Sequence, residues 1–209
     1  MLPRSGSTRP TRCDPLNLRG ESPALTMLAV ASLVHVVVGM SGGRALDRSP
    51  RPSLRGTVAL VALSLLADVD VVAFRLGIPY SAPFGHRGAT HSIAFAMLAG
   101  AAAAALLARE GRWSFSRIAL VACLVAISHP LLDAMTDGGL GVALLWPFSN
   151  ARFFAPWRPI PVAPIGARML STRGLHVLWI EAIGSLPLLA WAVWPRARRA
   201  IRGSGTTDS

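Results

Sequence analysis

Residues 118–135 read IALVACLVAISHPLLDAM, an almost wholly apolar run that contains His129 and Asp133 near its end. A helix of ~20 apolar residues is long enough to cross the ~30 Å hydrocarbon core of a membrane. Ionisable side chains are costly at that depth, and those that occur there usually serve a function. The run therefore predicts a membrane helix that carries part of a functional site.

Four other apolar segments extend this prediction to the rest of the chain. They lie at about 24–40, 57–78, 92–108 and 174–194. The chain is 52% hydrophobic and 15% charged, whereas soluble domains average about 25% charged residues. We therefore predict an all-α, polytopic transmembrane helix bundle of about four or five spans, surrounded by lipids in the inner (plasma) membrane.

The basic residues narrow the choice of partners. The net charge of +11 comes from 21 basic residues, all of them arginine. They lie mainly in the polar connections, which is usual beside membrane helices. They form no basic stripe interleaved with aromatic residues, so we expect no nucleic-acid partner. They also divide almost equally between the two ends of a five-span bundle, which leaves the membrane orientation open.

The apolar segments divide the chain into one domain and two tails. Residues 1–23 are rich in Arg, Pro, Ser and Gly and are predicted to be a disordered tail, with Met27 as an alternative translation start. Residues 24–195 form the membrane-embedded domain, and residues 196–209 form a basic polar tail.

Polar residues in the other segments are placed so that they meet the polar end of residues 118–135. The second segment carries an Asp-Val-Asp sequence at residues 68–70, and the motif GHRGATHS at residues 85–92 precedes the third. His35 and Glu181 add one ionisable side chain each from the first and fifth segments. If successive helices run in opposite directions, these groups approach the same end of the bundle and form one site.

The spacing of these residues suits metal binding. His129 and Asp133 are four residues apart, so on a helix they lie on one face and either bind one ion together or form a hydrogen-bonded pair. Asp68 and Asp70 diverge by about 200° on a helix, so both reach one ion only if the helix ends there. Of these two carboxylates, Asp70 is the predicted ligand.

The candidate residues fall into two groups. The predicted metal ligands are His35, Asp70, His86, His91, His129 and Asp133. The predicted catalytic residues are Asp68, Arg87 and Glu181, with Arg87 binding an anionic group of the substrate. Glu181 has three alternatives: metal ligand, general base or hydrogen bond between helices. The two cysteines are not expected to be ligands, so the cofactor is a divalent ion, with Zn²⁺ preferred and Mn²⁺ or Fe²⁺ as alternatives.

This donor set predicts hydrolysis. A bound metal ion with an open position makes a water molecule a nucleophile near neutral pH, and a free carboxylate can act as general base. A site at membrane depth favours a small or amphiphilic substrate.

The motifs also resemble those of a known family. The residues concerned are His35, LADVD at residues 66–70, GHRGATHS at residues 85–92, SHPLLDAMT at residues 128–136, and the run from Gly141 to LWPF at residues 145–148. On these residues, over about 27–165, the chain resembles the YdjM-like family of membrane-bound, predicted metal-dependent hydrolases. The family tends to have Pro in place of Ala67, so the helix break before the Asp pair is less strongly specified here. A likeness to zinc-dependent phospholipase C-like proteins, in the use of His and Asp on helices, implies a phosphoester substrate.

Two other functions remain open from the sequence. Buried His and Asp residues also serve transporters and proton relays, in which they line a path between the two membrane faces. A non-catalytic membrane protein with a structural metal ion would instead have a closed site, ligated by protein on every side.

Overall fold

The regular elements of the structure, a computed structural model, are all helical. It describes residues 33–47, 49, 52–164 and 166–194, so both predicted tails and the alternative start lie outside the described residues. In chain order the elements are α2 (Leu33–Leu46), α3 (Leu54–Leu65), η1 (Leu66–Val71), α4 (Val72–Arg75), η2 (Ala89–His91), α5 (Ile93–Ala108), α6 (Phe115–Ala134), η3 (Gly166–Leu170) and α7 (Thr172–Val193). Within these residues, β-pairing is limited to two isolated bridges. The prediction of an all-α fold is confirmed.

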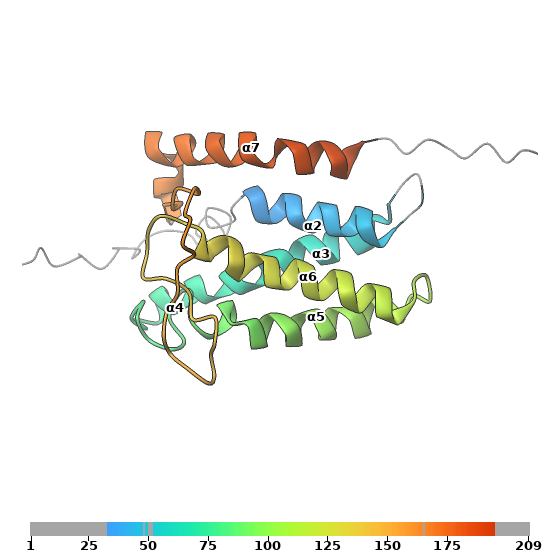
Figure 1. Cartoon of the computed structure of the whole chain (residues 1–209), viewed down its shortest axis with the longest axis horizontal. Helices are drawn as coiled ribbons and strands as arrows, with labels where there is room; N and C mark the ends of the chain where they lie inside the picture. The colour runs from blue at the N-terminus through green and yellow to red at the C-terminus, as the bar shows by residue number, and fades with distance from the viewer. Residues whose placement is uncertain (1–32, 48, 50–51, 165, 195–209) are drawn as a thin grey trace, which may run out of the picture.

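The helices form a bundle with α2 near its centre. Helices α2, α3, α5 and α6 lie side by side with their axes nearly parallel, and α7 lies along the outside of α2 (Figure 1). Small residues let neighbouring backbones approach closely. A Cβ on Gly39 would lie 2.5 Å from the Cα of Val61, and a Cβ on Gly100 would lie 2.8 Å from the Cα of Cys123. These glycines set the spacing of α2 against α3 and of α5 against α6.

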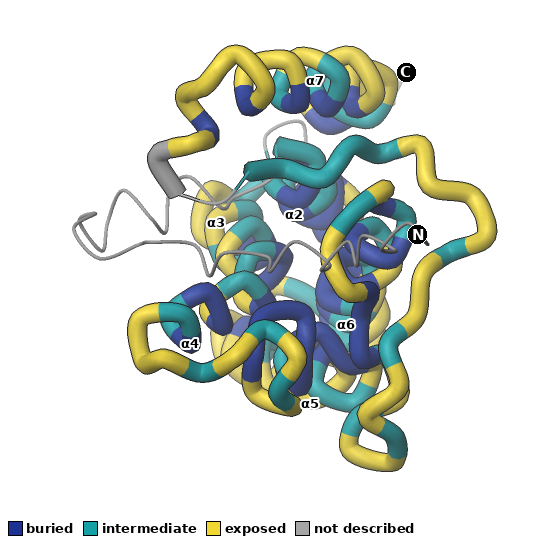
Figure 2. Tube along the Cα trace, turned by 90° about the vertical axis from the view of Figure 1, so that its left-hand side faces the viewer, coloured by how far each residue is buried: buried dark blue, intermediate teal, exposed yellow. Residues whose placement is uncertain are grey.

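The outer faces of the bundle are apolar, as lipid contact requires. Leu98, Leu120 and Trp179 are 72%, 62% and 66% exposed, and Figure 2 shows exposed residues along the outside of the helices. Continuous apolar surface of this kind marks a membrane or protein contact. In the described residues, α2 and α5 are shorter apolar helices, and three segments are long and apolar enough to cross a membrane: Leu54–Arg75, Phe115–Ala134 and Thr172–Val193. The prediction of a transmembrane helix bundle is confirmed.

Helix α2 extends beyond the predicted apolar segment, to Leu46 rather than about residue 40. The extension contains Arg44, whose guanidinium donates to the carbonyl of Trp194 at 2.6 Å and lies 5.2 Å from the centre of the Trp191 ring. Basic side chains near a helix C-terminus satisfy carbonyls that have no partner within the helix. These contacts join the C-terminal ends of α2 and α7.

The opposite end of the bundle is made of irregular segments. Helix α3 gives way at Leu66 to the tighter turn η1, although Ala67 stands where the resemblance expects Pro. The long loop (residues 135–164) connects α6 to η3 and crosses this same end (Figure 1). The N–H of Ala143 in this loop donates to the carbonyl of Arg87 at 3.0 Å. Four parts of the chain therefore meet at this end: η1, residues 85–92, the end of α6 and the long loop.

Asp47 stabilises the connection between α2 and α3. Its carboxylate accepts hydrogen bonds from the backbone N–H groups of Ser49 and Ser53 and from Arg112, each at 3.0 Å. Burial raises the pKa of Asp47, but these donors outweigh burial and hold the pKa below its ordinary value.

We expect Asp47→Ala to lower the free energy of unfolding by about 1–3 kcal/mol near pH 7, because two N–H groups lose their acceptor. A carboxylate with a lowered pKa stabilises the fold above its unfolded pKa of about 3.9, and this contribution is lost as the pH falls through the folded pKa. The thermal unfolding midpoints of wild type and variant should therefore converge below about pH 4. A gap that stays constant into strong acid would contradict this role.

Candidate metal centre

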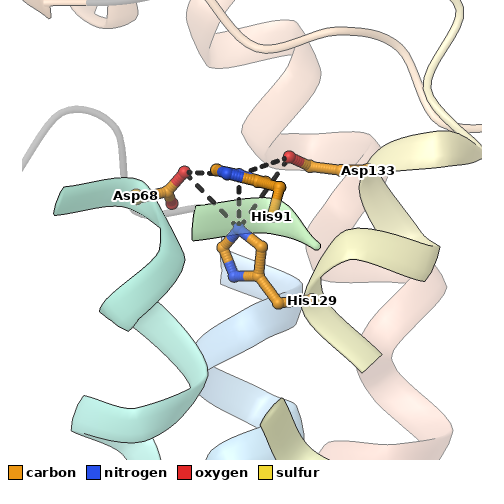
Figure 3. Close-up of side chains that lie close together, drawn as sticks. All are labelled: Asp68, His91, His129 and Asp133. Atoms are coloured by element: carbon orange, nitrogen blue, oxygen red, sulfur yellow. Dashed lines mark hydrogen bonds and ion pairs between the residues drawn. The ribbon is translucent and has the colours of Figure 1, made fainter. Parts of the chain in front are cut away.

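Four ionisable side chains converge at the irregular end of the bundle (Figure 3). Asp68 comes from η1, His91 from η2, and His129 and Asp133 from α6. One ligand atom from each residue lies within 4.8 Å of the others. The two imidazole Nε2 atoms are 3.2 Å apart, and the carboxylate oxygens lie between 3.1 and 3.8 Å from them.

These spacings suit one metal ion. Zinc bonds of ~2.0–2.1 Å in tetrahedral geometry place neighbouring ligand atoms ~3.3 Å apart, which falls within the range found here. Imidazole and carboxylate ligands without thiolate also suit Mn²⁺ and Fe²⁺. The geometry therefore accommodates a divalent ion without specifying which one.

Hydrogen bonds behind the two imidazoles leave lone pairs facing the centre. The Nδ1 of His129 donates to the backbone carbonyl of Ser64 at 2.6 Å, and the Nδ1 of His91 donates to the carboxylate of Asp70 at 2.9 Å. Because these acceptors carry no proton, the proton of each neutral imidazole sits on Nδ1 and its Nε2 is a free acceptor. Two Nε2 lone pairs and two carboxylates then face one another in a nearly buried space. They repel one another unless a positive charge lies between them, either a metal ion or a proton on the Nε2 of His91, which lies 3.1 Å from Oδ2 of Asp133.

Asp70 lies behind this group and orients it. Besides His91, its carboxylate accepts hydrogen bonds from the Nδ1 of His86 at 2.6 Å, the hydroxyl of Thr90 at 2.7 Å and the N–H of Arg87 at 3.0 Å. A carboxylate that holds a ligating imidazole in this way fixes both its tautomer and its direction.

Arg87 is the ion-pair partner of Asp133. Its Nε lies 3.1 Å from Oδ2 and its Nη2 donates to Oδ1 at 3.3 Å. Its Nη1 donates to the hydroxyl of Thr136 at 2.7 Å. All three residues are buried, so water does not compete with this two-point contact. Arg87 thus fixes the carboxylate and offsets part of the negative charge at the centre.

The histidine loop (residues 85–92) has a backbone that few residue types allow. A Cβ on Gly88 would lie 2.2 Å from the carbonyl oxygen of Pro83, so the loop can close only around glycine here. Arg87 has a left-handed backbone with φ of 59°, which costs a residue other than glycine about 1–3 kcal/mol. Arg152 of the long loop donates to the carbonyl of Arg87 at 3.3 Å and helps to hold this conformation.

A narrow cleft with about 40 Å³ of open space lies beside the centre, enough for at least one water molecule. Asp68 and Asp133 line it, together with His35 and Glu181, whereas the two ligand-candidate imidazoles lie behind them. The centre is therefore approached from its carboxylate side.

Comparisons with known proteins give the family. Residues 30–200 match the family described as YdjM inner membrane protein. The chain is also 36% identical over 172 residues to inner membrane protein YbcI of Escherichia coli (strain K12). The matched region covers 79% of this chain and 98% of that protein. The chain belongs to the YdjM family. Its predicted location in the inner membrane is confirmed, and no solved structure matches it.

This YdjM-family protein brings three of the predicted metal ligands into the group of four: His91, His129 and Asp133. The fourth member is Asp68, which the sequence pattern assigns to catalysis. Residues two apart on a tight helical turn face different sides, and in η1 it is Asp68 that faces α6. Asp70 and His86, both predicted as ligands, lie outside the group of four and form a hydrogen-bonded pair, and His86 also lines the cleft.

The remaining predicted site residues surround the centre. His35 lines the cleft, with its Nε2 3.7 Å from Oδ1 of Asp133. Arg87, assigned from the sequence to a substrate anion, contacts Asp133 and also lines the cleft. Glu181 accepts a hydrogen bond from the N–H of Leu33 at 2.8 Å, the contact between helices that was one of its three alternatives, and it also lines the cleft.

Sequence reasoning missed the groups that position the ligands. The carbonyl of Ser64 holds His129, but a backbone acceptor has no sequence signal. Thr136 ends the quoted motif SHPLLDAMT but was given no role, and Arg152 was not singled out. Thr90 lies in the quoted motif GHRGATHS, but it was given no part in holding a ligand.

Proposed function

We propose that this protein is an integral membrane hydrolase in which Asp68, His91, His129 and Asp133 hold a divalent metal ion, Zn²⁺ first and Mn²⁺ or Fe²⁺ as alternatives. The observation that carries the proposal is the set of four possible ligand atoms, all within 4.8 Å of one another, beside a cleft. A divalent ion with an open coordination position lowers the pKa of a bound water molecule to about 7 and so supplies a hydroxide nucleophile. An ester or phosphoester is the class of bond that this chemistry breaks.

Other residues of the cleft supply proton transfer. The Nδ1 of His35 is buried and has no hydrogen-bond partner among the described residues. Its other ring nitrogen, Nε2, lies 3.7 Å from Oδ1 of Asp133, so this imidazole can pass a proton beside that carboxylate. Glu181 lines the same cleft, and its carboxylate can orient water or accept a proton. Arg87 keeps Asp133 in position during these transfers.

The compact arrangement supports hydrolysis over transport. The polar groups of the candidate centre gather at one end of the bundle, and the apolar core beyond them contains Leu60, Ile118 and Ala122, each 0% exposed. A proton relay would instead need polar groups along a path to the other end.

The presence of four protein ligand atoms favours a second candidate function, in which the metal ion is structural and joins η1, η2 and α6. Structural zinc sites are closed by four protein ligands, whereas catalytic sites keep one position for water. Here two of the four donors are carboxylates that border the cleft. A substrate or water molecule can reach the centre on that side, which supports the catalytic function.

Elemental mass spectrometry of the detergent-purified wild-type protein, combined with hydrolysis assays, tests the proposal. We expect near-stoichiometric zinc, manganese or iron, and hydrolysis of 4-nitrophenyl phosphate or its diester. Treatment with 1,10-phenanthroline should remove both the metal and the activity, and adding back the ion should restore both.

Two outcomes would contradict the proposal. If the protein contains no metal after reconstitution with each ion, the centre does not hold one. If the metal is present but no phosphate or carboxylate ester is hydrolysed, and chelation unfolds the protein, the ion is structural.

Asp70→Asn should weaken metal binding without removing a ligand. Asparagine replaces one acceptor oxygen by a donor, so it cannot accept all four hydrogen bonds, and His91 loses its fixed tautomer. Loss of such a partner lowers metal affinity by about 10–100-fold, measurable by competition with a coloured chelator. Asp137→Asn is the matched control, because Asp137 is exposed and accepts from the N–H of Val162 in the long loop at 2.7 Å. Equal affinities in the two variants would contradict the orienting role.

A further inference from the structure

An apolar groove runs between α6 and α7 with α2 as its floor. Helix α2 packs against both neighbours, whereas α6 and α7 have few contacts with each other, and Figures 1 and 2 place α2 between them. The groove has about 240 Å³ of open space and an almost wholly apolar lining. Its walls include Val121 and Leu124 from α6 and Leu188 and Trp191 from α7.

The groove continues the cleft of the metal centre along α7. Glu181 lines the cleft and Leu188 lines the groove. Gly184 lies between them on the same helix face, since residues three, four and seven apart share a face. A Cβ built on Gly184 would meet nothing within 4 Å. Gly184 is exposed, so at this position of α7 no side chain covers the surface between cleft and groove.

The other two helices show the same continuity. On α2, Val34 lines the cleft and Val38, one turn further, lines the groove. On α6, Leu132 lines the cleft and Leu124, two turns earlier, lines the groove. On each of three helices, residues that line the cleft are followed by residues that line the groove. We call this succession, from the candidate metal centre to the far end of the groove, the track.

The length of this track matches one lipid chain. From Val34, beside the centre, to Ala45, at the far end of the groove, α2 rises by ~16 Å at ~1.5 Å per residue. One leaflet of a membrane, half of the ~30 Å hydrocarbon core, is ~15 Å thick and is filled by acyl chains of that length. The outer faces of the same helices are apolar and lie in the membrane, so the available occupant is a lipid.

We propose that the substrate is a membrane lipid whose acyl chain lies in this groove while its ester or phosphoester group enters the cleft. This inference rests on the proposed function. In the reaction, the bond between the carbonyl carbon or phosphorus and the leaving oxygen breaks, and the oxygen of water takes its place. The proton of water passes through His35 or Glu181 to the leaving oxygen. No further reactant is needed.

The expected preference for the groove is modest, for a physical reason. The surrounding lipid tails are as apolar as the groove, so a chain gains packing contacts there but no hydrophobic free energy. We expect about tenfold enrichment over an ordinary lipid contact, which corresponds to ~1.4 kcal/mol.

Photolabelling measures this enrichment. The protein is placed in bilayer discs of phosphatidylglycerol that contain a trace of the same lipid with a diazirine at the end of one acyl chain. Labelled peptides are mapped by mass spectrometry. We expect about tenfold more label at Leu188, Trp191 and Val121 than at Leu98 and Leu106, which are 72% and 60% exposed on α5 and report ordinary lipid contact.

Gly184→Trp should remove the enrichment, because the indole covers the surface between cleft and groove. Leu186→Trp is the matched control, since Leu186 lies on another face of α7 and is 54% exposed. Hydrolysis of 4-nitrophenyl phosphate and metal content should be unchanged in both variants, because this substrate has no chain to place in the groove.

Three results would overturn the inference. The first is equal labelling of the groove and α5 in wild type, and the second is undiminished enrichment in Gly184→Trp. The third is enrichment near Trp191 only when the diazirine sits beside the head group, which would identify a lipid of the opposite leaflet. If wild type retains metal and hydrolyses the soluble ester, these results contradict only the inference that the substrate is a membrane lipid. If wild type does neither, the proposed function itself fails.

Discussion

His129→Ala and Asp68→Asn are each expected to leave the purified protein without its metal ion. His129→Ala removes an Nε2 acceptor that lies 3.2 Å from that of His91, and Asp68→Asn removes a negative charge while keeping the size of the side chain. Each change deletes a ligand rather than the support of one. The loss of affinity should therefore exceed about 100-fold, the upper end for residues that only hydrogen-bond to a ligand. Elemental mass spectrometry and chelator competition measure it.

The control for this pair is His176→Ala, which removes an exposed imidazole from α7. Gel filtration and thermal unfolding show whether each variant is folded, and the near-isosteric Asp68→Asn keeps the test informative if His129→Ala misfolds. Wild-type metal content in either folded variant would place the ion elsewhere. If Asp70→Asn lowered the metal affinity more than Asp68→Asn, then Asp70 would be the ligand and Asp68 the residue that orients it.

Arg87→Met should destabilise the protein by about 3–5 kcal/mol, the usual cost of removing one partner from a buried ion pair. The side chains of Arg87 and Asp133 are only 7% and 10% exposed, so in the metal-free protein the substitution leaves a carboxylate inside the protein without its arginine partner. The midpoint of thermal unfolding in detergent measures the effect.

Arg112→Met is the matched control, because Arg112 pairs with Asp47 but its own side chain is 49% exposed. Exposed ion pairs contribute about 0–1 kcal/mol, so this variant should unfold close to wild type. If Arg87→Met were as stable as Arg112→Met and instead showed a raised KM for an anionic substrate, Arg87 would contact substrate, as the sequence pattern suggested.

The boundaries of the helices show how far apolar patterning reaches. The segment at 118–135 becomes α6, which begins three residues earlier, at Phe115. Helix α2 ends at Leu46, later than the predicted end near residue 40, because Arg44 donates to the carbonyl of Trp194 at the end of α7. A pattern of apolar residues locates a membrane helix, but its ends depend on contacts that other helices supply.

In the candidate site too, the sequence predicted which residues come together, whereas tertiary contacts decided their roles. The sequence placed Asp68, His91 and His129 at one end of the bundle, because direction alternates from one helix to the next. It favoured Asp70 over Asp68 without settling the choice, since that choice depends on where α3 tightens into η1. Nor could it assign Arg87 to Asp133, because these two residues meet only after the histidine loop folds against the end of α6.

By itself, the sequence determined a helical membrane protein with one polar end, since segment length, hydropathy and the order of the polar residues are enough for that. Only the tertiary structure decided which carboxylate faces the imidazoles and where a groove meets the cleft. These features depend on the rotation of each helix about its axis and on the path of the long loop. A helix that is apolar on every side carries no polar face to fix that rotation, so packing between the helices has to set it.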